Sequence, residues 1–234
     1  MKVLRYALIT ATAAFAFVGM APTASAAPPS TDIIGGGTAT NAPWAARMFN
    51  NGQQRCSATI IAPQFILTAK HCTQGTTPSA VQFRVGSLDQ LSGGVVVRAV
   101  QYSSHPVADF TVVRIDRAVN ATFSPLGTTV SVGQTAQVYG WGATCTNQPE
   151  INCQSRFLKV ASVSVFSVNS RDAFGGIAVG ARRINGITAG GDSGGPMFAG
   201  GRQVGVASTS DRSTTTFYTN ITQYRSFIAS VAGV

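Results

Sequence analysis

The sequence Gly191-Asp192-Ser193-Gly194-Gly195-Pro196 decides how the rest of the chain is interpreted. Glycine on both sides of a serine lets the backbone approach a bound molecule closely. It also lets the backbone N–H groups of Gly191 and Ser193 point at one spot, where they can hold the oxyanion of a tetrahedral intermediate. A glycine-rich β-turn explains a short Gly-x-Ser-x-Gly string equally well, but the full six-residue string is far more specific. Ser193 is therefore a candidate nucleophile.

A serine nucleophile needs a base that titrates near neutrality, and histidine is the usual supplier. The chain has only two histidines, His71 and His105. His71 stands in Leu67-Thr68-Ala69-Lys70-His71-Cys72, after a β-rich run and beside a cysteine that would tether it. His105 precedes Pro106 in a loop segment, and we expect it to be a surface residue. His71 is therefore the candidate base.

Asp109 opens the apolar run Phe110-Thr111-Val112-Val113-Arg114-Ile115. Burying a carboxylate at such a place is costly unless hydrogen bonds satisfy it. The Nδ1–H group of a histidine is a suitable partner. A turn residue at the start of a strand explains this aspartate equally well when it is considered alone.

Short β-rich runs separated by glycine- and asparagine-containing turns make up most of the chain. Many such strands imply a sandwich or barrels, and the pattern does not choose between them. One face of a closing helix is formed by Tyr224, Phe227, Ile228 and Val231. The expected strands are Ser57–Ile61, Phe65–Thr68, Val81–Val85, Val95–Val100, Thr111–Ile115, Gln134–Tyr139, Leu158–Val165, Met197–Ala199, Gln203–Ala207 and Thr215–Asn220.

Residues 1–26 have the features of a secretory signal peptide. Lys2 and Arg5 give a positive start, residues 6–20 are apolar, and Ala24-Ser25-Ala26 is a small-x-small cleavage site. A membrane anchor is the alternative, but a spanning helix needs about 20 apolar residues. We therefore expect an extracellular protein that is not bound to a membrane, with a short Pro-rich linker at residues 27–32.

The four cysteines of an exported chain are expected to form disulfides, and they allow three connectivities. We favour the sequence-local choice, which pairs Cys56 with Cys72 and Cys145 with Cys153. A zinc site is the alternative, but zinc prefers close Cys-x-x-Cys or His-x-x-x-His spacings, and neither occurs in the chain. We expect no metal.

The composition, 44% hydrophobic and 11% charged residues, excludes a disordered chain. The formal net charge is +9, but the basic residues are scattered, and Arg182-Arg183 is their only adjacent pair. A nucleic-acid binder would show a clustered basic stripe with interleaved aromatic residues. The charge indicates solubility and weak affinity for acidic surfaces, and we expect no nucleic-acid partner.

The three motifs resemble the triad segments of the chymotrypsin–trypsin family, in that family's chain order of His, Asp and Ser. The resemblance extends from Ile33 to about Ile221. Four further segments support it. Ile33-Ile34-Gly35-Gly36 resembles the N-terminus made by zymogen cleavage, and Gly140-Trp141-Gly142 resembles the start of a loop of the second barrel. Ser208 resembles the serine that supports the triad aspartate, and Phe217-Tyr218-Thr219 resembles the segment behind the primary pocket.

The resemblance implies an all-β fold, with two six-stranded antiparallel β-barrels and a C-terminal α-helix. The barrels would comprise residues 33–125 and 126–234, after a short propeptide at residues 27–32. It also implies a secreted serine endopeptidase, in which Ser193 is the nucleophile, His71 the general base and acid, and Asp109 the group that orients His71. The Gly191 and Ser193 N–H groups would form the oxyanion hole.

The family needs no cofactor, and residues 87–94 lack the acidic pair of the family's calcium loop, so we expect no calcium. The implied partners are protein or peptide substrates and proteinaceous inhibitors, and we expect a monomer. Lys70 stands where the family usually has alanine, and we expect its ammonium group to point into solvent.

By the same resemblance, cleavage before Ile33 frees an α-ammonium group that pairs with Asp192 and orders the oxyanion hole. Asp32 precedes this bond, whereas zymogens activated by trypsin carry Lys or Arg there, so trypsin would not be the natural activator.

The implied substrate-binding residues are Ile187, Ser208, Ser210 and Thr216. Ile187 replaces the aspartate at the pocket floor of trypsin-like members and cannot pair with a substrate Arg or Lys. Ser210 and Thr216 stand at the pocket walls, where wide-pocket members have glycine. They predict a small or medium apolar P1 residue. The cysteine pair that usually closes this pocket is absent, with Ala189 at one of its positions.

Two other functions compete with this interpretation. One is a catalytically silent homologue that binds a partner through its basic surface, against which the presence of all three triad residues argues. The other is a serine esterase of the α/β-hydrolase class, which runs Ser, acid, His along the chain and alternates strands with helices. Neither feature is found in this sequence.

Overall fold

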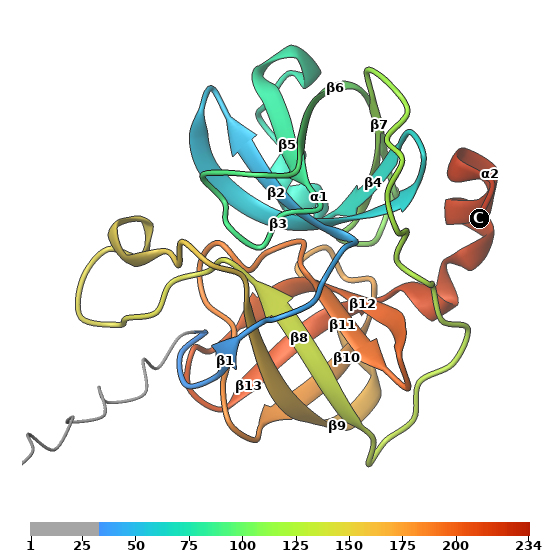
Figure 1. Ribbon diagram of the computed structural model, residues 1–234. Helices are drawn as coiled ribbons and strands as arrows, with labels where there is room; N and C mark the ends of the chain where they lie inside the picture. Colours follow the sequence, from blue (N-terminus) through green and yellow to red (C-terminus); the bar gives the residue numbers. More distant parts are fainter. Residues whose placement is uncertain (1–32) are drawn as a thin grey trace, which may run out of the picture.

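Six antiparallel strands close the first barrel, in the order β2-β3-β4-β7-β6-β5. The computed structural model describes residues 33–234, so the expected signal peptide and propeptide lie outside the described residues. Figure 1 shows this barrel stacked on a second one. Its strands are β2 (Ala45–Asn50), β3 (Gln53–Ala62), β4 (Phe65–Thr68), β5 (Val81–Val85), β6 (Val95–Ser104) and β7 (Thr111–Ile115).

The second barrel has six strands in the order β9-β10-β13-β12-β11-β8, and a further pairing of β8 with β9 closes it. The two-residue strand β1 (Gly37–Thr38) pairs with β9 at its edge. The strands are β8 (Thr135–Gly140), β9 (Lys159–Arg171), β10 (Ile177–Arg183), β11 (Pro196–Ala199), β12 (Arg202–Ser210) and β13 (Thr215–Asn220). The two-barrel fold that the resemblance implied is therefore confirmed.

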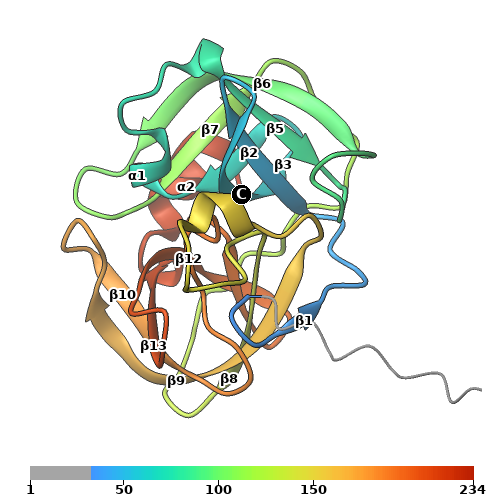
Figure 2. The same ribbon diagram turned by 90° about the vertical axis from the view of Figure 1, so that its left-hand side faces the viewer.

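The helical segments are few, and the C-terminal one joins the two halves of the molecule. Helix α2 (Arg225–Ala232) follows the last strand of the second barrel, but its buried Ile228 packs into the hydrophobic cluster of the first barrel. Figures 1 and 2 both show it beside the first barrel. The others are α1 (Lys70–Thr73) and three 3-10 helices, η1 (Pro78–Ala80), η2 (Glu150–Cys153) and η3 (Ile221–Gln223).

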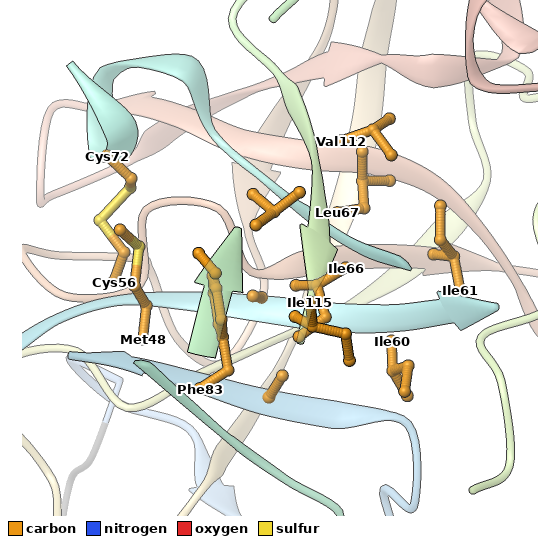
Figure 3. Close-up of a cluster of buried hydrophobic side chains, with 14 of the residues drawn as sticks. Met48, Cys56, Ile60, Ile61, Ile66, Leu67, Cys72, Phe83, Val112 and Ile115 are labelled. Carbon is orange, nitrogen blue, oxygen red and sulfur yellow. A yellow bond between two sulfur atoms is a disulfide. The ribbon is translucent and has the colours of Figure 1, made fainter. Parts of the chain in front are cut away.

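The barrel cores follow from the two-residue period of side chains along a strand. In β5, Val81, Phe83 and Val85 are buried, while Gln82 and Arg84 between them are partly exposed. Figure 3 shows the resulting cluster in the first barrel, with the disulfide of Cys56 and Cys72 at one end. This rigid apolar core holds the strand ends from which the candidate catalytic residues project.

All ten expected strands and the closing helix are confirmed, with differences of a few residues at their ends. Three strands, β1, β2 and β10, were not expected from the sequence. Strand β1 is only two residues long. The sequence of β2, Ala-Ala-Arg-Met-Phe-Asn, has no β-branched residue, and that of β10, Ile-Ala-Val-Gly-Ala-Arg-Arg, has only two among alanine, glycine and arginine, so neither shows the β-branched run that marks a strand. The predicted boundary at residue 125 falls between β7 and β8 and stays a prediction. Within residues 33–234, no helix has the length and apolar character needed to cross a membrane.

Candidate active site

The antiparallel pairing of β4 with β7 brings His71 and Asp109 together. Thr68, at the end of β4, lies opposite Thr111, at the start of β7, so the segments beyond these two residues meet at one end of the first barrel. Asp109 is fully buried, and its Oδ2 atom lies 2.7 Å from His71 Nδ1. The backbone N–H of His71 donates a second hydrogen bond of 3.0 Å to Asp109 Oδ1. The carboxylate thus holds both the ring and the backbone of His71.

Ser208 donates a third hydrogen bond to this carboxylate, of 2.6 Å to Asp109 Oδ2. Burial acts to raise the pKa of Asp109, but the hydrogen bonds from His71 and Ser208 outweigh it and hold that pKa below its ordinary value. An ionised carboxylate accepts only, so the proton on the histidine ring lies on Nδ1. The Nε2 atom of His71 is then left as an acceptor, the state that a general base requires.

A second buried carboxylate, which the sequence analysis missed, supports the first. Asp172 Oδ2 accepts 2.9 Å hydrogen bonds from the backbone N–H of Asp109 and from Thr219 Oγ1. Its other oxygen accepts from the N–H groups of Phe174 and Gly176, at 2.9 and 2.8 Å. Asp172 therefore ties the Asp109 backbone to the second barrel. An aspartate before a Gly-Gly pair carries only the signal of a turn, so the sequence did not point to this contact.

The Ser193 loop enters from the second barrel, between β10 and β11. Gly191 and Gly194 have φ angles of +99° and +79°, a region that glycine alone visits readily. A Cβ atom on Gly194 would collide with Thr68 Oγ1, so glycine also permits the loop to lie against the first barrel. The backbone N–H of Ser57 donates to Ser193 O at 2.8 Å, which fixes the serine across the barrel interface.

Ser193 and His71 line one cavity of about 290 Å³. Within residues 33–234, the hydrogen bonds join His71 to Asp109 but include none between Ser193 Oγ and the His71 ring. Nor does any hydrogen bond of that part of the chain use the N–H of Gly191 or of Ser193 as donor. Both N–H groups are thus unpaired within the described part of the chain.

Ser208 and Ser210, both predicted to bind substrate, line this cavity. Ile187 and Thr216 are fully buried and lie outside the lining. Thr216 Oγ1 instead lies 2.7 Å from Oγ1 of Thr188, which does line the cavity. Thr188 and Arg212 also line the cavity, although no local sequence signal marks either residue. The remaining lining residues are Ala189, Gly190, Ala207 and Thr209.

The family model for trypsin matches residues 33–228. The chain belongs to the trypsin family. Trypsin alpha of Drosophila melanogaster is 30% identical to it over 200 residues, which cover 75% of this chain and 76% of that protein. The family and its trypsin-named relatives make the protein a serine endopeptidase.

Two solved structures show the same fold. An inactivated protease paralogue of the scabies mite has a TM-score of 0.75 at 22% identity, over 84% of this chain and 96% of that one. A mutant of human heparin binding protein has a TM-score of 0.74 at 25% identity, over 84% and 95% of the two chains. A shared fold alone therefore does not establish catalysis.

In this trypsin-family chain, an ion pair joins Arg212, which lines the cavity, to Glu150 of η2. The Arg212 Nη2 atom donates to Glu150 Oε2 at 3.1 Å, and Nε donates to Oε1. The hydrogen bond from Arg212, together with one from the Gly190 backbone, lowers the pKa of Glu150. Because Arg212 is about half exposed, the ion pair adds little to stability and serves mainly to hold the two loops together.

The disulfides of this trypsin-family chain join Cys56 to Cys72 and Cys145 to Cys153, the pairing favoured by the sequence. The first bond anchors helix α1, which carries His71, to strand β3. The ligand atoms of His71, Cys56 and Cys72 lie within 4.8 Å of one another, as in some metal sites. The two sulfur atoms are bonded to each other, however, so they do not offer thiolate ligands.

Two expectations about this region were wrong. Lys70 does not simply point into solvent, because its ammonium group donates to the carbonyls of His105 and Pro106 at 3.0 and 3.1 Å and lies 4.6 Å from the Phe174 ring centre. His105 is not a free surface residue but packs among the rings of Phe110, Tyr224 and Phe227. Lys70 thus links the helix of His71 to the loop that leads to Asp109.

Asp192 is fully buried below the Ser193 loop of this trypsin-family protein. Its carboxylate accepts hydrogen bonds from the N–H groups of Gly142 and Ala189, at 2.7 and 2.9 Å. Burial nevertheless raises its pKa to about 6. Ile33 is also fully buried, in the hydrophobic cluster of the second barrel. The charge of Arg47 acts to lower this pKa but does not offset the effect of burial.

Proposed function

We propose that the protein hydrolyses peptide bonds through an acyl-enzyme on Ser193. Ser193 Oγ attacks the substrate carbonyl while His71 Nε2 takes its proton, and the N–H groups of Gly191 and Ser193 bind the oxyanion. His71 then gives the proton to the leaving amine. A water molecule, activated by the same imidazole, cleaves the acyl-enzyme. The observation that carries this proposal is the 2.7 Å contact of His71 Nδ1 with the buried Asp109 carboxylate.

We also propose that the protein is secreted after removal of residues 1–26 and becomes active after removal of residues 27–32. The positive start, apolar run and small-x-small cleavage site of residues 1–26 support secretion with removal of this segment. Its partners in this proposal are protein or peptide substrates and proteinaceous inhibitors, and it acts as a monomer without metal or cofactor.

Covalent labelling tests the proposed nucleophile. A sulfonyl fluoride or an organophosphonate is expected to modify the processed protein once, at Ser193, because the reaction needs an activated hydroxyl and an oxyanion hole. Peptide mapping by mass spectrometry locates the adduct. Ser193→Ala should remain unlabelled, and His71→Ala should react far more slowly while keeping the fold. A folded, processed protein that takes no label at Ser193 would rule out the proposal.

We propose a P1 preference for small or medium apolar residues such as Ala, Val or Leu. Ile187 supplies no charge at the place where trypsin-like members hold an aspartate, and it is buried outside the cavity lining. Thr188 and Ser210 add side chains to the cavity wall, and Thr216 supports Thr188 through a hydrogen bond. These residues narrow the space available to a P1 side chain.

A library of peptides that differ at P1 measures this preference. We expect kcat/KM for Ala, Val or Leu to exceed that for Arg or Lys by at least about 10², because a buried substrate cation without a carboxylate partner is costly. The matched variant Ser210→Gly removes a wall side chain and should shift the preference toward larger apolar residues. A wild-type preference for Arg would show that the proposed pocket is wrong.

A catalytically silent binding protein is the second candidate. The chain has a net charge of +9, and the similar structures include an inactivated protease paralogue and a protein named for heparin binding. The contact of His71 with Asp109 and the presence of Ser193 favour catalysis instead. The labelling experiment separates the two, because a silent homologue takes no label.

A further inference from the structure

Arg47 is an unusual residue to find in the middle of a strand. It is fully buried in β2, between Ala46 and Met48, which both belong to the hydrophobic cluster of the first barrel. Because neighbouring side chains on a strand point to opposite faces, Arg47 points away from that core and toward the second barrel. Burying a guanidinium group is expensive unless it is well hydrogen-bonded, so its partners show what it does.

The guanidinium group of Arg47 uses all three of its nitrogens. Nε donates to Gln90 Oε1 at 3.0 Å, and Nη2 donates to Gln154 Oε1. Nη1 crosses the barrel interface and donates to the backbone carbonyl of Gly191 at 3.0 Å. Gln90 is itself fixed by a 2.8 Å hydrogen bond to Ser155 O. The glutamines therefore orient the guanidinium plane, and the remaining donor is aimed at the Ser193 loop.

The Gly191 carbonyl has a second donor, Ser57 Oγ, at 2.9 Å. The other end of the same peptide unit is also held, since Asp192 N donates to Ala189 O at 3.1 Å. This peptide plane is thus fixed at both ends. Only the φ and ψ angles of Gly191 separate it from the Gly191 N–H, and the φ angle of +99° is one at which other residues would be strained.

We propose that Arg47 is a positioning residue of the oxyanion hole, which holds the Gly191 carbonyl so that the Gly191 N–H faces the cavity. The inference rests on the proposed function, because it assigns a role in the same catalytic site. Donors aimed in advance at a developing oxyanion are worth far more than donors that must reorient, so a residue that fixes their direction affects kcat.

The charge of Arg47 supports this role at neutral pH. Burial lowers the pKa of its guanidinium group to about 9, while the negative charge of Asp192 acts to raise it. The groups that face the guanidinium are Gln90, Gln154, the Trp141 ring at 6.0 Å and Asp192, and only Asp192 among them titrates. Arg47 therefore remains a cation in the range where a histidine base works.

The first experiment compares the processed protein with its Arg47→Met variant. We expect kcat to fall by about 10²-fold, the size of a lost oxyanion-hole contact, and KM to change little. A peptide boronate, which forms a tetrahedral adduct on the serine, should lose affinity by the same factor. The corresponding peptide alcohol has no carbonyl oxygen and should bind as before. Arg98→Met, which removes an exposed arginine of β6, is the control and should match the wild type.

A merely structural role would lower the melting temperature and leave kcat of the folded protein unchanged, or would weaken the boronate and the alcohol equally. Either result would overturn the proposal. If Ser193→Ala keeps its activity, the proposed function itself has failed. If Ser193→Ala is inactive and Arg47→Met has the wild-type kcat, only the role of Arg47 has failed.

The Arg47→Lys variant provides a second test in case the methionine variant does not fold. The ordinary pKa of lysine is about 10.4, against about 12.5 for arginine. The same burial should therefore bring the pKa of this lysine close to neutral pH, so that the side chain loses its charge in the working range of the enzyme. We expect the kcat of this variant to be lower than that of the wild type at pH 6 and to fall further toward pH 8, a range in which Arg47, with a pKa of about 9, stays charged. The wild type should show no such loss over this range. A lysine variant with the wild-type kcat and pH profile would contradict the proposal.

Discussion

Replacing Asp109 by asparagine is expected to lower kcat by about 10⁴, the loss that this substitution causes in the type enzyme of the family. The buried carboxylate accepts hydrogen bonds from His71 Nδ1, from the His71 backbone N–H and from Ser208 Oγ. An asparagine amide must place an NH₂ group against one of these donors. The hydrogen bond is kept only if the amide NH₂ donates to His71 Nδ1, which places the ring proton on Nε2. A histidine in this tautomer cannot take the proton of Ser193.

Steady-state kinetics on a peptide amide measure the change in kcat. Active-site titration of the wild type gives its concentration of active enzyme. Ser208→Ala is the matched control, because it removes one of the three donors and leaves the histidine tautomer intact. We expect the kcat of Ser208→Ala to fall by about tenfold or less. Thermal unfolding of each variant shows whether the fold is kept. An Asp109→Asn variant that is folded and retains more than a tenth of the wild-type kcat would contradict the proposed role.

Retaining residues 27–32 is expected to lower kcat/KM by a factor on the order of 10²–10³, the value of lost oxyanion-hole donors. Asp192 is fully buried and has a pKa of about 6 in the uncleaved chain. Cleavage before Ile33 frees an α-ammonium group with an ordinary pKa of about 7.7–8.0, which can pair with the carboxylate. That ion pair would fix Asp192 and, through it, the loop that carries Gly191 and Ser193.

An engineered cleavage site directly before Ile33 allows the same preparation to be assayed before and after processing, with the new N-terminus checked by sequencing. Processed Asp192→Asn should be as poorly active as the unprocessed protein. Full activity of an unprocessed chain would refute the activation mechanism.

The stability of the unprocessed chain gives an independent check. Because the Asp192 pKa is higher in the folded chain than its ordinary value of 3.8, the folded state binds this proton more tightly. The resulting stabilisation is complete below about pH 4 and is lost as the pH rises through about 6. Asp192→Asn should remove this slope from the unprocessed chain.

The sequence predicted the strand segments well because β-rich runs leave local signals. Val81–Val85 and Thr111–Ile115 alternate or cluster β-branched residues, and the observed strands have the same bounds. His71 and Ser193 stand in motifs whose neighbours are as informative as the residues themselves. The family resemblance then supplied the barrel topology, which no local pattern contains.

The residues that were missed act over long distances in the sequence. Arg47 lies 144 positions before Gly191, and Asp172 lies 63 positions after Asp109. Nothing near either residue shows that its partner is the Ser193 loop or the Asp109 backbone. His105 was misjudged for the same reason, since two of the rings around it, Tyr224 and Phe227, come from the C-terminal end of the chain. Such contacts follow from the closed barrels and not from local composition.

The proposed catalytic residues come from different barrels, and this has a consequence for the newborn chain. His71 and Asp109 are both made with the first barrel, whereas Ser193 follows β10 and Ser208 lies in β12. A partly synthesised chain on the ribosome thus lacks the proposed nucleophile until residue 193 has been added. It is unable to digest its neighbours until the second barrel has closed and docked. Under the proposed function, the order of these residues along the chain delays proteolysis until translation is nearly complete, independently of the propeptide.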